Sequence, residues 1–577
     1  MKSFNELKKN LKKDFSSFKK TRVAIVGDSA TQFLTQCLKG HAYEEAYNFE
    51  IYEADFDQVE RQILDTSSEL YEFKPEFVII FQSVQKLTKK FYKSDKSQAV
   101  SFSNEHLKSI ENFYYTLTDN LKAKVIYFNF PEINDNVFGN FSSKIEQSFT
   151  YQLRKINFEL MSLSTRCKNF YILDYSAISS LFGKKQSFDP KIYYTTDMVL
   201  SLEILPWVAK NISDIILAIS GKFKKCLILD LDNTMWGGII GDDGIENIQI
   251  GSLGIGKAFT ELQLWIKQLK ERGIILAVCS KNNESTAKEP FEKHPDMVLS
   301  LDDIAMFVAN WDNKADNIRY IQSVLNIGFD SMVFIDDNPF ERSMVRTHIP
   351  EVLVPELPED PSLYLDYLLE LNLFETASFS EEDGNRTKQY QEEAGRAVAQ
   401  KSFTNEDDFL ADLNMTSEVK GFNKFNVPRV AQLSQRSNQF NLRTVRYTED
   451  DIETLSSSTD HETLSFTLKD KFGDNGLISV VILLKQKEIM FIDTWLMSCR
   501  VLKRGMENFT LNTIVKIAKE NGFAKVTGEY IETAKNSMVK DHYKNLGFTL
   551  VDGFWQLDVS AYENRKCFIA TENENLK

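Results

Sequence analysis

The sequence predicts an α/β protein with parallel sheets that is completed by an α+β domain. Two observations lead to this prediction: apolar runs alternate with helix-length connections up to about residue 355, and three strands joined by tight turns follow residue 460. Apolar runs separated by helices are typical of parallel strands buried on both faces. The length of 577 residues allows roughly three to five domains.

The first segment, residues 1–215, is expected to form one open parallel sheet. Its predicted strands are Val23–Val26, Phe49–Glu53, Phe77–Phe81, Val125–Phe130 and Phe170–Leu173. Ahead of them, apolar residues recur every three or four positions, which predicts an amphipathic helix docked on its own protein. These residues are Phe4, Leu7, Leu11, Phe15 and Phe18.

The second segment, residues 216–370, repeats the alternation. Its predicted strands are Leu227–Leu231, Ile274–Val278, Met297–Leu299, Met332–Ile335 and Val352–Val354. Three prolines at 355, 358 and 361 mark the exit from this domain, because proline removes a backbone donor and ends regular structure.

A polar helical connector at residues 371–410 leads to an α+β domain at residues 411–577. The connector is followed by predicted strands and helices in the order Leu464–Lys469, Leu477–Leu484, Ile489–Trp495, a helix at about 504–520, Lys525–Ile531 and a helix at about 536–546. Tight turns are predicted at Gly473–Gly476 and at Gln486-Lys487, since glycine and asparagine tolerate turn conformations.

Composition excludes several classes of protein. The formal net charge of −15 disfavours a nucleic-acid binder, which needs a basic face. The six cysteines are scattered without a CxxC pair, which disfavours a disulfide framework and a structural zinc site, and a cytoplasmic location is expected. No apolar run reaches the ~20 residues of a membrane span, and the lysine-rich start lacks the apolar core of a signal peptide.

The most informative residues are the two carboxylates of Asp230 and Asp232, which end a predicted buried strand. Ligands of open α/β sheets bind at the carboxyl ends of strands, where Ser280 and the pair Asp336-Asp337 follow later strands. Four neighbouring acids repel one another unless a cation lies among them, and oxygen ligands suit Mg²⁺. Asp230, Asp232, Asp336 and Asp337 are therefore the predicted metal ligands.

A phosphoryl-transfer site also needs a nucleophile and groups that hold the phosphate. Asp230 can form an aspartyl phosphate, and Asp232 can act as general acid and then base. Thr234, Ser280 and Lys314 are the predicted phosphate-binding residues.

These residues resemble the haloacid dehalogenase (HAD) superfamily of phosphotransferases. Asp230, Asp232 and Thr234 match its first motif, DxDxT, while Ser280, Lys314 and the Asp336-Asp337 pair match the later motifs in order. The segments 230–238, 241–244 and 278–283 further resemble FkbH-like proteins. That resemblance implies removal of phosphate from 1,3-bisphosphoglycerate, a phosphorylated three-carbon acid, and loading of the glyceryl group onto an acyl carrier protein as a thioester. It also implies a small glycine-rich flap after Thr234 in place of a large cap domain.

Two further residue patterns leave alternatives open. Cys279 precedes Ser280 and is a candidate acyl acceptor, although strand alternation would turn it away from the site and a buried core thiol is the competing interpretation. Val23–Ser29 ends in a GDS sequence that resembles the SGNH hydrolases. The Asp-x-x-His and the oxyanion-hole residues of that family are missing, so we expect a degenerate binding domain.

The last domain resembles the GNAT acyltransferases through the segment Cys499–Gly505. Arg500 and Gly505 fit the pyrophosphate-binding pattern of that family, but Lys503 replaces its first glycine. The resemblance implies a site for phosphopantetheine or CoA, and the polar segment Gln435–Asn441 is a candidate lining for it, with a surface cap and turn as the other interpretation.

The primary hypothesis is thus an FkbH-like, Mg²⁺-dependent enzyme that loads a carrier thiol. A phosphatase acting on another small phosphorylated metabolite, without acyl transfer, is the main alternative. A non-catalytic scaffold that binds a carrier or CoA is weaker, because packed carboxylates are costly without a metal. An acetyltransferase acting through the last domain is disfavoured by Lys503.

Overall fold

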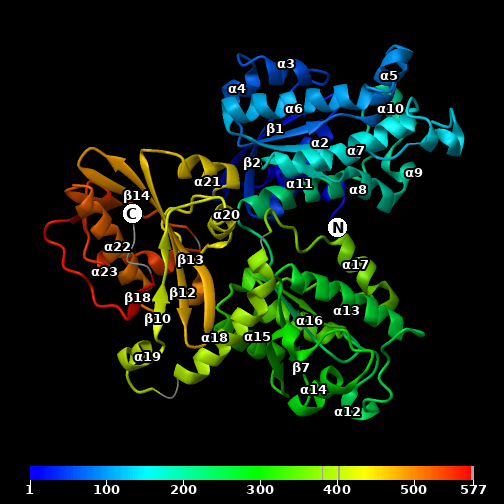
Figure 1. Cartoon of the computed structure of the whole chain (residues 1–577). Helices are drawn as coiled ribbons and strands as arrows, with labels where there is room; N and C mark the ends of the chain where they lie inside the picture. Colours follow the sequence, from blue (N-terminus) through cyan, green and yellow to red (C-terminus); the bar gives the residue numbers. More distant parts are fainter. Residues whose placement is uncertain (134, 380, 401–402, 534, 573–577) are drawn as a thin grey trace. The chain divides into compact units, whose positions relative to one another are not determined.

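The computed structural model describes residues 1–572 apart from 134, 380, 401–402 and 534. The chain divides into two units, Met1–Leu217 and Ala218–Lys577 (Figure 1). No helix in the described part of the chain combines the length and apolar character needed to cross a membrane.

The first unit is built on a five-stranded parallel sheet with the order β2-β1-β3-β4-β5. Its strands are β1 (Lys19–Gly27), β2 (Tyr47–Glu53), β3 (Phe77–Phe81), β4 (Lys124–Phe128) and β5 (Phe170–Leu173). All five strands coincide with predicted apolar runs. The long helices α6 (Phe102–Leu121) and α7 (Phe149–Arg166) pack on the sheet through a continuous buried cluster.

The amino-terminal helix docks on its own protein, as predicted, but it is shorter than the apolar spacing indicates. Helix α1 (Phe4–Lys9) begins with a capping box between Ser3 and Glu6, and it packs on α2 (Gln32–Glu44). A Cβ at Gly40 would overlap the main chain of Leu7, so the contact requires glycine there. Phe15 and Phe18 lie beyond the helix and pack on Tyr43.

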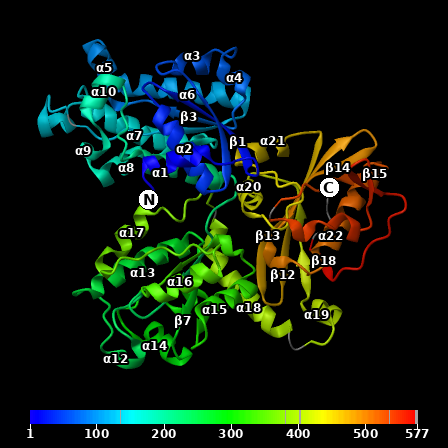
Figure 2. The same cartoon turned by 180° about the vertical axis from the view of Figure 1, so that it is seen from behind.

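The second unit begins with a four-stranded parallel sheet of order β8-β7-β6-β9. Its strands are β6 (Cys226–Leu229), β7 (Ile275–Ser280), β8 (Ile304–Ala309) and β9 (Met332–Ile335). Helices α13 (Gly256–Glu271) and α17 (Tyr364–Glu370) share one buried cluster with it. Helices α15 (Lys314–Leu325) and α16 (Pro339–His348) share the other (Figure 2).

Two predicted strands of this domain are wrong. Met297–Leu299 is not a strand, because the N–H groups of Val298 and Leu299 donate to the side chain of Gln263 instead of to a neighbouring strand. The strand at this edge is β8, which the sequence analysis missed. Val352–Val354 contributes only one isolated bridge, between Leu353 and Val333.

The rest of the second unit is a mixed nine-stranded sheet, which confirms the α+β prediction. Its long strands β12 (His461–Asp470), β13 (Gly473–Gln486) and β14 (Ile489–Met497) pair in antiparallel fashion. Strand β15 (Lys525–Gly528) then pairs with β14 in parallel. The short strands are β10 (Met415–Ser417), β11 (Val419–Lys420), β16 (Thr549–Val551), β17 (Phe554–Asp558) and β18 (Ile569–Thr571).

Helix α22 (Met506–Glu520) covers this sheet, as predicted, while two other elements differ from the prediction. The turn lies at Lys471-Phe472 and β13 starts at Gly473, because the Asp470 carboxylate accepts the N–H groups of Phe472 and Gly473. The helix expected at 536–546 is reduced to a 3₁₀ turn, Ser537–Val539, and one helical turn, α23 (His542–Asn545).

An inserted segment, Phe440–Leu442, fills the space where β14 and β15 diverge beyond their four paired residues. The N–H of Leu442 donates to the carbonyl of Trp495 (3.2 Å), and the N–H of Met497 donates to the carbonyl of Phe440 (3.0 Å). On the other side, the N–H of Ile531 donates to the carbonyl of Leu442 (2.9 Å). The chain itself therefore satisfies the main-chain groups that the divergence exposes.

Candidate active site

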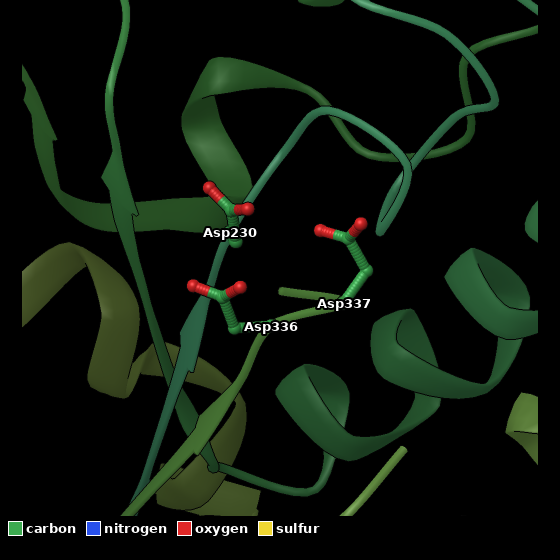
Figure 3. A group of neighbouring side chains, drawn as sticks. All are labelled: Asp230, Asp336 and Asp337. Atoms are coloured by element: carbon green, nitrogen blue, oxygen red, sulfur yellow. The ribbon is translucent and has the colours of Figure 1, made fainter. Parts of the chain in front are cut away.

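The strand ends of the four-stranded sheet bring three carboxylates together. Asp230 follows β6, and the pair Asp336-Asp337 follows the adjacent strand β9. One carboxylate oxygen from each of the three lies within 4.8 Å of the others (Figure 3). Asp336 is fully buried, Asp230 is 6% exposed, and the N–H of Asp230 donates to the carbonyl of Ile335 at 3.0 Å, which fixes the two strand ends side by side.

Lys314, the first residue of α15, neutralises part of this charge. Its Nζ lies 2.9 Å from an Asp230 oxygen and 2.5 Å from an Asp336 oxygen, and its side chain is 3% exposed. Burial by itself lowers the pKa of Lys314, but the two carboxylates outweigh it and raise the pKa above its usual value. Burial and the nearby Asp230 raise the pKa of Asp336 to about 7 against the opposing effect of Lys314.

Three ionised carboxylates and one ammonium leave a net negative charge in a buried site. The three aspartates offer carboxylate oxygens as ligand atoms, and oxygen is the ligand that Mg²⁺ prefers. These residues therefore fit a hard divalent cation. Asp230, Asp336 and Asp337 are the residues that would hold it.

Thr234 lies against the same group. Its hydroxyl accepts the N–H of Asp337 at 3.1 Å and lies 3.4 Å from an Asp337 carboxylate oxygen. Ser280 ends β7, the other neighbour of β6, and is almost fully buried at the same sheet edge. The structure thus brings together five of the predicted site residues: Asp230, Thr234, Lys314, Asp336 and Asp337, with Ser280 at the adjacent strand end.

The carboxylate of Asp232 lies outside the group of three. It accepts hydrogen bonds from the indole of Trp236 (3.0 Å), the N–H of Ile240 (3.0 Å) and the amide of Asn282 (2.9 Å). Burial raises its pKa despite these donors, so its protonated form is favoured relative to an exposed aspartate. Asn282 belongs to the sequence segment compared with the FkbH-like proteins, but its role in orienting Asp232 required the structure.

The chain after Thr234 forms a short loop instead of a separate cap domain. Gly237 and Gln249 exchange main-chain hydrogen bonds of 3.0 and 2.8 Å, and a single helical turn, α12 (Ile240–Asp243), lies between them. Trp236 is fully buried, whereas Trp311 is 70% exposed.

Arg342 is a supporting residue that sequence reasoning missed. Its guanidinium donates to the main-chain carbonyls of Asp336 (2.9 Å) and Asp337 (2.6 Å), and also to Glu356. The side chain comes from α16 and is 3% exposed, so it holds the turn that presents both carboxylates. In the sequence, the one feature that could have indicated this role is the position of Arg342, six residues after Asp336.

Cys279 is not brought to the site. Its side chain is fully buried in the cluster that contains Ile318 and Phe334, on the α15 face of the sheet. The thiol lies 3.7 Å from the main-chain carbonyl of Lys314. Burial raises its pKa well above the usual value, which disfavours the nucleophilic thiolate.

The two residues predicted to bind a cofactor, Arg500 and Gly505, have different surroundings. Arg500 is buried and contacts Gln389 of α18 (Arg386–Gln400), the main chain of Asn475 and the ring of Tyr390. Gly505 precedes α22 with a φ of 77° and does not line the pocket to which Arg500 contributes.

In the first unit, the serine of the GDS sequence is fully buried. The Ser29 hydroxyl has no hydrogen-bond partner within the described residues. The neighbouring Asp28 accepts the N–H of Ser83 at 2.8 Å and lines a polar pocket with Lys86 and His106. Burial lowers the pKa of His106 to about 3, which makes it a weak base, and the buried Ser29 is not accessible to a substrate.

Asp28 predicts a pH dependence of stability. Burial raises its pKa to about 6, against the lowering effects of Ser83 and Lys86, so the folded state binds more protons than the unfolded state between about pH 4 and 6. Stability of the first unit should therefore fall as pH rises through this window, and D28N should flatten the dependence. Urea midpoints at half-unit pH steps measure it, and an unchanged profile in D28N would contradict this assignment.

Comparison with known proteins follows the division of the chain. The FkbH N-terminal domain family matches residues 22–217. No curated protein matches the chain. Two solved acetyltransferases match parts of it: the ribosomal-protein-S18-alanine N-acetyltransferase of Escherichia coli and the spermidine N-acetyltransferase of Vibrio cholerae with CoA and spermine. The first is 14% identical, and its match covers 28% of this chain and 99% of that one, with a TM-score of 0.20. The second is 11% identical, and its match covers 25% of this chain and 96% of that one, also with a TM-score of 0.20. These values are too low to support a conclusion about function.

The informative match is the crystal structure of the N-terminal part of the protein BF1531 from Bacteroides fragilis, described as containing a phosphatase domain complexed with Mg. It is 55% identical, with a TM-score of 0.64, and the match covers 66% of this chain and all of that one. With this identity over the whole relative and the FkbH N-terminal domain in its first unit, the chain belongs to the FkbH-like family.

Proposed function

We propose that this chain is a Mg²⁺-dependent phosphatase that works through a phosphoryl-aspartate at Asp230. The observation that carries the proposal is the grouping of Asp230, Asp336 and Asp337 around the ammonium of Lys314. The arrangement supplies a carboxylate nucleophile, a cation for the phosphoryl oxygens and a ligand set for a hard divalent ion. The bound ion would neutralise charge that develops on the transferring phosphoryl group.

In this reaction the side chains have separate roles. The Asp230 carboxylate attacks phosphorus and the bond to the substrate oxygen breaks, which leaves a phosphoryl-aspartate. Asp232, whose pKa is raised by burial, gives a proton to the leaving oxygen and then accepts one from the water that hydrolyses the intermediate. Lys314, Thr234 and Ser280 hold the phosphoryl oxygens.

The finer proposal is that the substrate is 1,3-bisphosphoglycerate and that its glyceryl group is loaded onto an acyl carrier protein. Loading requires a carrier thiolate to attack the acyl carbon, so that a thioester forms and the 1-phosphate leaves as the acyl–phosphate bond breaks. The 3-phosphate is removed separately, by transfer to Asp230 and hydrolysis of the phosphoryl-aspartate. Family membership supports this proposal. A phosphatase acting on another small phosphorylated metabolite is favoured instead by one observation, the burial of Cys279, which removes the enzyme thiol that would relay the acyl group.

Intact-protein mass spectrometry can separate these functions. The enzyme is incubated with Mg²⁺ and 1,3-bisphosphoglycerate, with and without a phosphopantetheinylated carrier protein. A glyceryl adduct on the carrier supports acyl loading, whereas phosphate release without an adduct supports the phosphatase alone. Absence of phosphate release from this and from a panel of phosphorylated acids would contradict the proposal as a whole.

Cys279→Ala tests the thiol separately. Because Cys279 is a fully buried core residue, we expect C279A to release phosphate at a rate within about threefold of wild type and to lose on the order of 1 kcal/mol of stability from the cavity. Phosphate release and carrier loading are measured side by side. If loading alone disappears while release is kept, Cys279 is the acyl acceptor and the core interpretation is wrong.

A further inference from the structure

A second pocket, distinct from the phosphatase site, lies within the second unit and has a volume of about 450 Å³. One wall comes from the amino ends of β6 and β9, through Lys225 and the segment 326–331. Asp230 and Asp336 follow the carboxyl ends of the same two strands, so the pocket opens at the opposite edge of the sheet. The other wall comes from α18, α20 (Val427–Arg436), residues 437–440 and the end of β14.

The lining of this pocket is strongly basic. Its basic side chains are Lys225, Arg386, Arg429, Arg436, Arg500 and Lys535. The acids in the lining are Asp330 and Glu351. Behind the wall, the buried Asp383 pairs with both Arg386 and Arg436. The six cations exceed these three acids by three. The chain as a whole has a net charge of −15, so the positive charge is concentrated at this pocket, where it favours an anion.

Two polar atoms in this lining lack partners within the described residues. They are Nε of Arg436 and Oε1 of Gln439, both buried from solvent. Buried polar groups are normally hydrogen-bonded, so these atoms indicate a missing ligand or water. Burial and the adjacent Arg386 lower the pKa of Arg436 well below its usual value. The charged guanidinium is therefore destabilised in this pocket, and an anion beside it would stabilise it.

The remaining lining is apolar and aromatic. Tyr390, Leu433, Phe440 and Met497 contribute to the same pocket, and the guanidinium of Arg500 lies 5.9 Å from the ring centre of Tyr390. Phe440 is also the start of the inserted segment between β14 and β15. An inorganic anion would leave this apolar surface uncovered, whereas an anion that carries an organic stem would use both parts of the lining.

We propose that this pocket binds an organic phosphate, with the phosphate among the arginines and the organic stem against Tyr390, Leu433 and Phe440. Because the pocket lies at the sheet edge opposite Asp230, its ligand is bound and not hydrolysed there. The same chemistry is offered by the phosphopantetheine arm of a carrier or CoA and by free phosphorylated metabolites.

The test is calorimetric titration of the full chain carrying D230N, in EDTA, so that neither hydrolysis nor metal-dependent binding at the phosphatase site contributes. The probes are 4′-phosphopantetheine, pantetheine, 3-phosphoglycerate and inorganic phosphate. We expect phosphopantetheine to bind at least about 10-fold more tightly than pantetheine and inorganic phosphate. Equal affinity for 3-phosphoglycerate and phosphopantetheine would assign the pocket to a free metabolite, and tighter binding of phosphopantetheine would assign it to the arm.

Gln439→Glu places a carboxylate in the pocket with almost no change in shape, so it should occupy the arginines in place of the phosphate. Affinity for the organic phosphate should fall at least about 10-fold, without a lower melting temperature. Gln486→Glu, an equal change at the exposed last residue of β13, is the matched control and should bind as before. Unchanged affinity in Q439E, or equal affinity for pantetheine and phosphopantetheine, would overturn the proposal. Because no turnover is measured, this outcome is independent of the proposed phosphatase activity.

Discussion

Asp230→Asn is expected to reduce phosphate release by roughly 10³-fold or more, because the amide cannot form the phosphoryl-aspartate intermediate. The fold should persist. The amide oxygen can still accept from Lys314, which lies 2.9 Å from Asp230, and one of three repelling carboxylates is neutralised. Release of phosphate from a phosphorylated acid, measured at saturating Mg²⁺, gives the size of the loss.

Thermal unfolding distinguishes this loss from misfolding. Without Mg²⁺, D230N should melt at or above the wild-type temperature, since its site carries less negative charge. The rise in melting temperature that Mg²⁺ gives the wild type should be smaller in D230N, because the variant lacks one of the three oxygen donors. Asp366→Asn, on the exposed face of α17, is the matched control. Turnover of D230N close to that of D366N would remove Asp230 from the mechanism.

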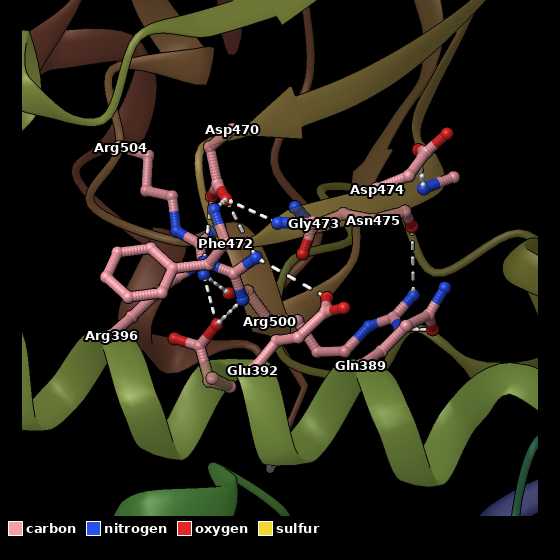
Figure 4. Close-up of polar contacts among 12 residues, drawn as sticks. Gln389, Glu392, Arg396, Asp470, Phe472, Gly473, Asp474, Asn475, Arg500 and Arg504 are labelled. Carbon is pink, nitrogen blue, oxygen red and sulfur yellow. Dashed lines mark hydrogen bonds and ion pairs between the residues drawn. The ribbon is translucent and has the colours of Figure 1, made fainter.

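Asp470→Asn should cause the largest loss of stability among single changes outside the site. The Asp470 carboxylate is fully buried at the end of β12, where it lies 2.8 Å from Arg396 of α18 and 3.2 Å from Arg504 (Figure 4). Removal of this charge leaves two buried guanidinium groups with Glu393 and Glu392 as their acidic partners among the described residues. Breaking a buried network in this way typically costs about 3–5 kcal/mol.

The free energy of unfolding, from urea titrations followed by near-ultraviolet circular dichroism, measures this cost. Asp474→Asn is the matched control, because Asp474 lies on the same hairpin with a side chain that is 56% exposed, and exposed pairs contribute at most about 1 kcal/mol. A difference below about 1 kcal/mol between D470N and D474N would mean that the buried network adds no net stability.

Much of the carboxylate site could be predicted from local sequence. Asp230 and Asp336 each follow an apolar run, and parallel strands end at one sheet edge, so their meeting needs only strand assignment. Lys314 was predicted from its place between Ser280 and Asp336 and from the resemblance, but not from a strand end, since β8, the strand before it, was missed. The strand predicted at Met297–Leu299 was wrong because apolar residues alone do not show where main-chain hydrogen bonds go. In the structure, the N–H groups of Val298 and Leu299 donate to the side chain of Gln263.

The sequence by itself determined the fold class, the strand ends that carry Asp230, Ser280 and Asp336, and the FkbH-like resemblance, because these depend on residue spacing along short segments. Only the tertiary structure decided which groups far apart in the chain meet. It placed Cys279 in the core, by strand alternation, and Arg342 behind the turn that carries Asp336 and Asp337. It also inserted Phe440–Leu442 beside β14 and gathered the arginines of α18 and α20 around one pocket. Such contacts depend on how separate elements pack, and no local pattern encodes that packing.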